Sequence, residues 1–333
     1  MGGQVHPACL VGGFVVVLAA TLLAVGLVRR LLLRFSILDH PNPRSSHTAP
    51  TPRGGGIGVL AVLLPVWTAI LVAVSADGTW WLVPLGALAL AGISWFDDVR
   101  DLPPLTRLVV QLVAAGVGTL SLPGLIFQGL LPPLVDTLAA ILLWVWFANL
   151  FNFMDGIDGL VGVEAASVGM GLFVVTVLAG TATALGWLGL TVAAASLGFL
   201  YWNWQPARIF LGDSGSVPIG YLIGWLCLAL AATGQWAAAI ILPLYYLADS
   251  SLTLARRLVR GERVWKAHRT HFYQVAVQHG IGHAQVCVRV IGANLVLVLL
   301  ALAANMWSPW LALVAAVLVV AATLAWMVRP PTT

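Results

Sequence analysis

The polar residues of this chain gather in five short stretches, and the longest of them is "NLFNFMDGIDGLVG", residues 149–162. It places two Asn and two Asp between apolar runs, in a chain of which only 8% of the residues are charged. If the stretch begins as a helix, Asn149, Asn152 and roughly Asp155 share one face. Their oxygens are hard ligands of the kind that Mg²⁺ prefers. A helix cap and a turn remain the alternative, because Asn, Asp and Gly are also turn residues.

A second stretch, "WFDDVRD" (residues 95–101), holds three acids that follow an apolar run. Asp97 and Asp98 are adjacent, and Asp101 lies one helical turn further on. Acids so close together raise one another's pKa unless a cation neutralises them. The pattern therefore favours a divalent metal ion or a cationic partner, with helix capping as the alternative, above all for Asp101.

Two glycine-rich stretches are typical of phosphate binding. In "FLGDSGS" (residues 210–216), Asp213 lies between glycines before an apolar helix, where backbone N–H groups face a phosphate and the acid can take a metal ion. An ordinary N-cap at Ser214 or Ser216 is the alternative. In "PTPRGGG" (residues 50–56), Arg53 and three successive Gly, with Arg44 upstream, predict a flexible cationic loop. Contact with anionic lipid headgroups is the alternative there.

The fifth stretch, "HRTHFYQ" (residues 268–274), concentrates hydrogen-bond donors at His268, Arg269 and His271. The His spacing is compatible with zinc, but no Cys or third close ligand completes such a site. A diphosphate group is the better match. We interpret His279 and His283, which precede the next apolar run, as membrane-interface residues.

The elements that must position these residues are membrane helices. Hydrophobic residues make up 60% of the chain, and charged residues are far below the roughly 25% of soluble domains. Spans of about 20 apolar residues predict an all-α polytopic membrane protein, with residues 1–333 as a single domain. The eleven expected spans are near 8–28, 57–75, 80–96, 105–121, 133–150, 161–179, 184–203, 216–233, 236–256, 285–305 and 308–328.

The positive charges predict the orientation of these spans. All 16 Lys and Arg fall in the odd-numbered connections, in the helix ends beside them or in the C-terminal tail. The positive-inside rule therefore places these connections in the cytoplasm and the N-terminus outside. The five polar stretches then share one cytoplasmic face. The net charge of +4 follows from this topology and does not indicate nucleic-acid binding.

Together these groups match the needs of phosphoryl transfer, in which catalysis is mainly positioning and charge neutralisation. Carboxylates and carboxamides can hold magnesium, while Arg, His and backbone N–H groups can hold phosphates. No Gly–Lys–Ser/Thr sequence of the Walker type occurs, so ATP hydrolysis is not indicated.

With "PRGGG", "DDVRD", "NLFNFMDGIDGL", "FLGDSGS" and "HRTHFYQ" in this order, nearly the whole chain resembles the polyprenyl-phosphate N-acetylhexosamine-1-phosphate transferases. The resemblance implies that a polyprenyl phosphate, undecaprenyl phosphate in bacteria, attacks a UDP-N-acetylhexosamine and releases UMP. It also implies Mg²⁺, with Mn²⁺ as a second option. "HRTHFYQ" differs from the His-His-His-Phe of the peptidoglycan enzyme and is closer to the O-antigen-initiating enzymes, which makes a pentapeptide substrate improbable.

The resemblance also implies a role for each matching residue. Asn152 and Asp213 correspond to the magnesium ligands, with Asp213 also counted as catalytic. Asp97 corresponds to the acid near the lipid phosphate, and Asp98 to its partner. The substrate-binding positions are Arg53, Asn149, Asp155, Gly156, Ile157, Asp158, His268, Arg269 and His271. Among these, Asp158, Gly156 and Ile157 match the uracil site.

The sugar is left open between GlcNAc and a 6-deoxy sugar such as FucNAc or QuiNAc. The resemblance places the enzyme in the bacterial inner membrane, in the first membrane step of O-antigen or other surface-polysaccharide synthesis, and is compatible with a homodimer. A transporter is one alternative, because intramembrane acids often mark transport paths. Nearly all acids lie at the cytoplasmic ends of the spans, and Asp249, several residues before Arg256, is a partial exception. A CDP-alcohol phosphotransferase or an Asp-rich prenyltransferase is the other alternative.

Overall fold

The computed structural model describes residues 7–41, 49–100, 102–180, 183–264 and 268–329. Its helices are α1 (Pro7–Arg34), α2 (Gly55–Ala73), α3 (Leu82–Arg100), α4 (Pro104–Gly118), α5 (Pro133–Phe153), α6 (Leu160–Leu178), α7 (Thr183–Asn203), α8 (Asp213–Ala232), α9 (Trp236–Ile241), α10 (Leu244–Val259), α11 (Phe272–Gln278), α12 (His283–Met306) and α13 (Pro309–Met327). The short elements are η1 (Gly78–Trp81), η2 (Thr119–Ser121), β1 (Leu38–Asp39) and β2 (Thr51–Pro52). The two strands pair antiparallel.

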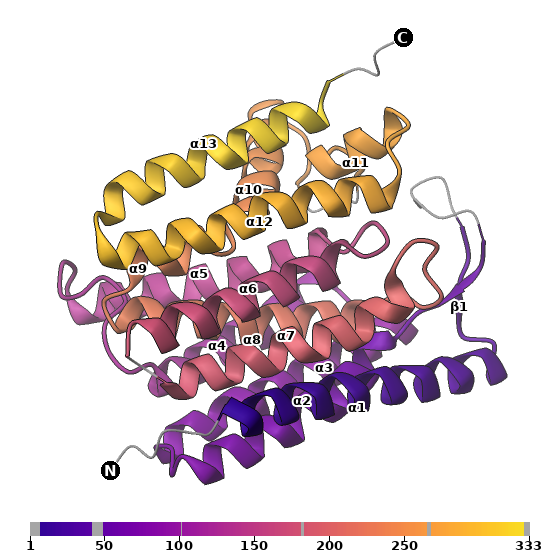
Figure 1. Cartoon of the computed structure of the whole chain (residues 1–333). Coiled ribbons are helices and arrows are strands. Elements are labelled where there is room, and N and C mark those ends of the chain that lie inside the picture. Colours follow the sequence, from indigo (N-terminus) through magenta and orange to yellow (C-terminus); the bar gives the residue numbers. More distant parts are fainter. Residues whose placement is uncertain (1–6, 42–48, 101, 181–182, 265–267, 330–333) are drawn as a thin grey trace.

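The long helices lie side by side as one bundle, and the start of α1 and the end of α13 lie at opposite ends of it (Figure 1). Within the described ranges, ten helices are long and apolar enough to cross a membrane. The chain is an all-α polytopic membrane protein, as its composition predicts.

Ten of the predicted spans match continuous helices to within a few residues at most ends. The prediction of one continuous span over 236–256 is wrong, because the chain breaks there into α9 and α10 at Leu242 and Pro243. Proline lacks a backbone N–H and its ring crowds the preceding turn, so a helix rarely continues through it. Figure 1 shows α9 and α10 in succession between the two ends of the bundle, so the interrupted segment still returns the chain toward α11.

Helix α8 lies at the centre of the bundle. Within its candidate span, 89% of the residues are buried, and α8 packs against α2, α3, α5 and α9. A helix that is apolar all round is expected in such a position. Asp213 is the first residue of α8. Because α8 is packed against several helices, the position of this acid in the bundle is fixed.

The predicted flexible Gly loop is instead a site of close helix packing. Gly55 and Gly56 form the first turn of α2, and a Cβ atom at Gly56 would overlap the backbone of Gly215 in α8. The backbone N–H groups of residues 54–56 donate to the carbonyl groups of Phe210 and Leu211 at 2.8–3.1 Å. These N–H groups are therefore occupied, and residues 54–56 form a packed helix start instead of the predicted flexible loop.

We expect Gly56→Ala to destabilise the protein by about 1–3 kcal/mol, because an extra methyl group must push two tightly packed helix ends apart. The measurement is the thermal midpoint of unfolding in detergent. Gly92→Ala in α3 is the matched control, since nothing lies within 4 Å of a Cβ atom there. Equal midpoints for the two variants would contradict the packing role of Gly56.

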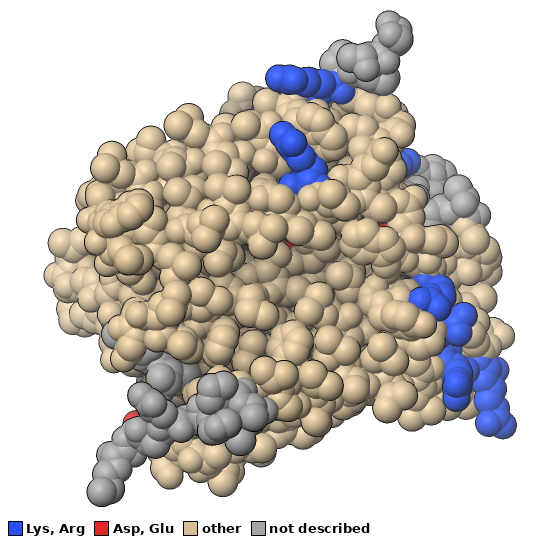
Figure 2. All heavy atoms as spheres, in the orientation of Figure 1, with Lys and Arg blue, Asp and Glu red and all other residues tan. Residues whose placement is uncertain are grey.

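Charge divides the visible surface of the bundle into two parts. The Lys and Arg side chains lie along the right-hand edge and beside the end of α13, whereas the wide area to their left shows no Lys or Arg and only traces of Asp or Glu (Figure 2). An uncharged band beside a cationic rim is the pattern expected where a membrane protein meets lipid and anionic headgroups.

Candidate active site

A cavity of about 600 Å³ lies where α3, α4, α5, α8 and α10 meet the segment that leads into α11. Two helices supply half of the lining residues, at helical spacing. They are Pro104, Arg107, Leu108 and Gln111 from α4, and Leu142, Val145, Trp146, Asn149, Asn152 and Phe153 from α5. The predicted shared face of Asn149 and Asn152 is confirmed. Asp97, Asp213, His268 and His271 also line this cavity, so four of the five polar stretches meet in it.

Two arginines hold the acids of the cavity. The Nη2 atom of Arg53 lies 2.6 Å from Oδ1 of Asp213. The Nη1 atom of Arg107 lies 2.5 Å from Oδ2 of Asp97 and 3.9 Å from Oδ2 of Asp213. The backbone N–H of Leu102 also donates to Oδ1 of Asp97 at 2.8 Å. The Asp97 side chain is 9% exposed, and a carboxylate so far removed from water needs such partners.

Sequence reasoning missed Arg107, which it treated only as a topology marker. The signal that could have found it is its spacing, because an Arg in the first turn of the helix after "DDVRD" can fold back on those acids. Its place between Asp97 and Asp213 makes it a cation that two acids and an incoming phosphate can share.

Oxygen atoms of the kind that magnesium prefers face the cavity, although the described residues contain no cluster of three or more His, Cys, Asp or Glu that could hold a metal ion. Asn152 and Asp213 face the same space as Asp97. Magnesium takes oxygen ligands, usually one or two carboxylates from the protein, with water and substrate phosphates completing its shell. The side chain of Asn149 is used otherwise, because its Nδ2 donates to Oε1 of Gln111 at 2.6 Å and to the carbonyl of Val145 at 2.8 Å.

Asp158 is not among the residues that line this cavity. Its Oδ2 accepts from the backbone N–H of Ala207 at 3.0 Å. The Nδ1 atom of His283 lies 3.3 Å from the Asp158 backbone nitrogen and 3.4 Å from Oδ2. Asp158 thus joins its loop to the chain before α8 and to α12. His283, predicted as an interface residue, is instead a buried partner of that acid.

The residues between Asn152 and Asp158 pack against α11. The hydroxyl of Tyr273 donates to the carbonyl of Phe153 at 3.0 Å. A Cβ atom at Gly156 would overlap that same hydroxyl, so only Gly fits. Ile157 is 6% exposed and belongs to the core, and Asp155 is half-buried. Contacts of Asp155, Gly156, Ile157 and Asp158 with a nucleotide stay predictions.

The two His of the fifth stretch form a stacked pair at the cavity. The ring centroids of His268 and His271 are 4.8 Å apart, and Thr270 Oγ1 lies 2.9 Å from Nδ1 of His268. Desolvation, helped by the charges of His271 and Arg257, lowers the pKa of His268 to about 4, so this ring is neutral near pH 7. Arg269 is half-buried and is not part of the lining, although its carbonyl accepts from Gln278.

Three acidic or basic residues of the predicted clusters fall wholly or partly outside the described structure. Asp98, the predicted partner acid, belongs to α3, but its side chain is not described. Asp101 and Arg44 lie outside the described residues altogether.

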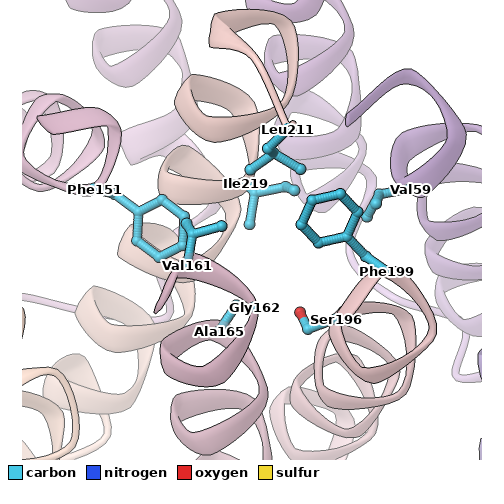
Figure 3. A pocket seen from close by; sticks show the side chains of 9 residues that line it. All are labelled: Val59, Phe151, Val161, Gly162, Ala165, Ser196, Phe199, Leu211 and Ile219. Carbon is cyan, nitrogen blue, oxygen red and sulfur yellow. The ribbon is translucent and has the colours of Figure 1, made fainter. Parts of the chain in front are cut away.

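A second, much smaller gap lies beneath the site, among α2, α5, α6, α7 and α8. Its volume is about 10 Å³, and the side chains around it are apolar except for that of Ser196 (Figure 3). A gap of that size has room for about one water molecule. The cavity of about 600 Å³ is the candidate active site because residues from four of the polar stretches line it.

Comparison with known proteins shows which family the chain resembles. Residues 80–231 match the model of glycosyl transferase family 4. A probable undecaprenyl-phosphate N-acetylglucosaminyl 1-phosphate transferase of Bacillus subtilis (strain 168) is 27% identical over 82% of this chain and 79% of that protein. A decaprenyl-phosphate N-acetylglucosaminephosphotransferase of Mycolicibacterium smegmatis is 30% identical over 79% of this chain and 74% of its own length. A phospho-N-acetylmuramoyl-pentapeptide-transferase of Synechococcus elongatus is also 30% identical, over 73% of this chain and 70% of that protein.

Proposed function

The chain belongs to the polyprenyl-phosphate N-acetylhexosamine-1-phosphate transferase family, and we propose that it transfers a HexNAc-1-phosphate from a UDP-sugar to undecaprenyl phosphate. The oxygen of the lipid phosphate attacks the sugar-bearing phosphorus, and a new P–O–P linkage forms. The bond between the sugar-bearing phosphorus and the bridging oxygen of the diphosphate breaks, and UMP leaves with that oxygen and the electron pair. The products are UMP and an undecaprenyl-diphosphate sugar.

The observation that carries this proposal is the mixed lining of the cavity. Its lining includes the polar residues Asp97, Arg107, Asn152 and Asp213. It also includes Leu108 and Leu142, which are 41% and 63% exposed on the bundle. A cavity with both kinds of lining suits a substrate with a phosphate head and a hydrocarbon tail. A transporter needs no such pairing of acids and arginines beside apolar residues.

Each polar group has a distinct task in the proposed reaction. Arg107 attracts the lipid phosphate, and Asp97 holds that guanidinium in place. His268 and His271, which line the cavity, would contact the diphosphate and the sugar, with Arg269 beside them adding positive charge. Arg53 would contribute positive charge on the nucleotide side. Positioned charges of this kind lower the barrier to phosphoryl transfer by bringing two anions together in the correct geometry.

The proposed metal ion is Mg²⁺, with Mn²⁺ as the alternative. Asn152 and Asp213 would hold it. When bound, it would neutralise charge on the diphosphate.

The proposed orientation follows the positive charges. The cavity faces the cytoplasm of a bacterium, the N-terminus lies outside, and the bilayer is the inner membrane. The lipid product is then the first membrane intermediate of an O-antigen or a related surface polysaccharide. GlcNAc, FucNAc and QuiNAc are the candidate sugars.

The test incubates purified enzyme in lipid nanodiscs with MgCl₂, undecaprenyl phosphate and a panel of UDP-N-acetylhexosamines, and measures UMP. We expect one UDP-sugar to give UMP release that requires the lipid phosphate and stops on addition of EDTA. Absence of UMP with every UDP-sugar would contradict the proposed reaction. UMP release that persists in EDTA would contradict the metal proposal alone.

A further inference from the structure

Asp249 is a fully buried acid in α10 that contacts the active-site segment without lining the cavity. Its Oδ1 lies 3.2 Å from Nδ1 of His271 and accepts from the backbone N–H of Phe272 at 3.0 Å. Its Oδ2 accepts from the backbone N–H of Tyr273 at 3.2 Å. The hydroxyl of Thr253 is also near, 3.4 Å from Oδ1. One carboxylate thus binds a cavity residue and the first turn of α11.

These contacts determine which ring nitrogen of His271 faces the cavity. An ionised carboxylate only accepts hydrogen bonds, so Nδ1 must carry a proton to bond to Asp249. The other nitrogen, Nε2, makes no hydrogen bond with any residue that the structure describes, and His271 lines the cavity. Nε2 is therefore the atom that remains for a ligand.

The ring of His271 is held from further directions. It stacks between His268 and Tyr273, with centroid distances of 4.8 and 5.6 Å. The backbone N–H of His271 donates to Oε1 of Gln274 at 3.2 Å. With the side chain 2% exposed, the ring has little room to turn.

A second buried acid shows what is special about Asp249. Asp136 in α5 is 2% exposed and accepts from the backbone N–H groups of Ile126 and Phe127 at 3.0 and 2.9 Å. It therefore makes the same pair of backbone bonds as Asp249, but it contacts no His. The bond to His271 is what a purely structural acid of this kind lacks.

We propose that Asp249 is a positioning residue, which holds His271 so that Nε2 points at the diphosphate of the nucleotide sugar. The inference rests on the proposed function and deepens it. An acid behind an imidazole fixes its orientation and its tautomer, and stabilises the ring when an anion approaches from the other side. Asp249 thereby links the position of α10 to the position of His271 beside the reacting groups, although Asp249 touches neither substrate.

The test is a double-mutant cycle of Asp249→Asn and His271→Asn, with kcat and KM measured by UMP release per folded enzyme. We expect Asp249→Asn to lower kcat about 10–100-fold, as removal of an orienting partner does elsewhere. The KM for undecaprenyl phosphate should change little. The double variant should be no slower than His271→Asn alone, because Asp249 then has no ring to orient.

Asp136→Asn is the matched control, since it removes an equally buried charge from two backbone N–H groups. It should lower the thermal midpoint but leave kcat per folded enzyme near the wild-type value. Should Asp249→Asn not fold, Asp249→Glu, which keeps the charge and shifts the carboxylate, takes its place in the cycle. If the wild-type enzyme is active, either of two results would overturn the inference. One is a double variant whose loss of kcat equals the product of the two single losses. The other is a kcat that neither substitution at Asp249 changes. An inactive wild type would overturn the proposed function and the inference together.

Discussion

Asp213→Asn should lower kcat about 1,000-fold, a loss on the scale of removing a preorganised charge from an active site. The Asn side chain has nearly the same shape as that of Asp and can still accept a hydrogen bond from Arg53. The loss of kcat therefore measures the effect of the missing negative charge. That charge now lies 2.6 Å from Arg53 and 3.9 Å from Arg107, at the first residue of the buried helix α8. The measurement is UMP release at saturating substrates.

The dependence of this variant on magnesium distinguishes two roles of Asp213. If the acid is a metal ligand, the concentration of MgCl₂ that gives half-maximal activity should rise in Asp213→Asn. The control is Asp77→Asn, an exposed acid whose Oδ1 caps η1 from outside the cavity, and it should behave like the wild type. Activity of Asp213→Asn near the wild-type level would exclude Asp213 from the reaction.

Asp97→Asn should lower kcat about 100-fold or more and leave the binding of the UDP-sugar nearly unchanged. The acid is bonded to Arg107 and to the backbone of Leu102, so its charge keeps the guanidinium in place for the lipid phosphate. A phosphate monoester has its second pKa near 6 and is already largely dianionic at pH 7. The lipid phosphate therefore needs placement more than it needs a strong base.

Two measurements test this account of Asp97. Calorimetric titration with the UDP-sugar should give similar dissociation constants for Asp97→Asn and the wild type, while the KM for undecaprenyl phosphate rises. A strongly weakened UDP-sugar affinity would place Asp97 on the nucleotide side instead. Direct attack also predicts no covalent intermediate, so isolation of a phosphorylated Asp from the enzyme would contradict it.

Local sequence was sufficient to predict the membrane helices and to identify the polar stretches that meet at the cavity. A run of about 20 apolar residues has few stable options in a bilayer other than a helix, because its backbone groups must be satisfied internally. Asn149 and Asn152 share a helix face by spacing alone. The polar residues at the ends of these helices are exceptions in an apolar chain, and they are therefore visible without a structure.

Contacts between distant segments could not be read in the same way. The three Gly of residues 54–56 have the composition of a flexible loop, but Gly56 packs against Gly215, which lies far along the chain. Arg107 looks like an interface residue until α3 and α4 fold back together. The carboxylate of Asp158 is equally ambiguous in sequence, and the fold joins it to Ala207 and His283.

The sequence by itself thus determined the family, the membrane helices and most of the polar residues that line the cavity, because each depends on composition or short-range order. Only the tertiary structure decided the break between α9 and α10, the paired arginines around Asp97 and Asp213, and the link from Asp249 to His271. The physical reason is that a buried charge is stable only beside a partner that neutralises it, so its role depends on which partner the fold supplies. In this protein those partners come from other helices, whose packing brings them within hydrogen-bond distance.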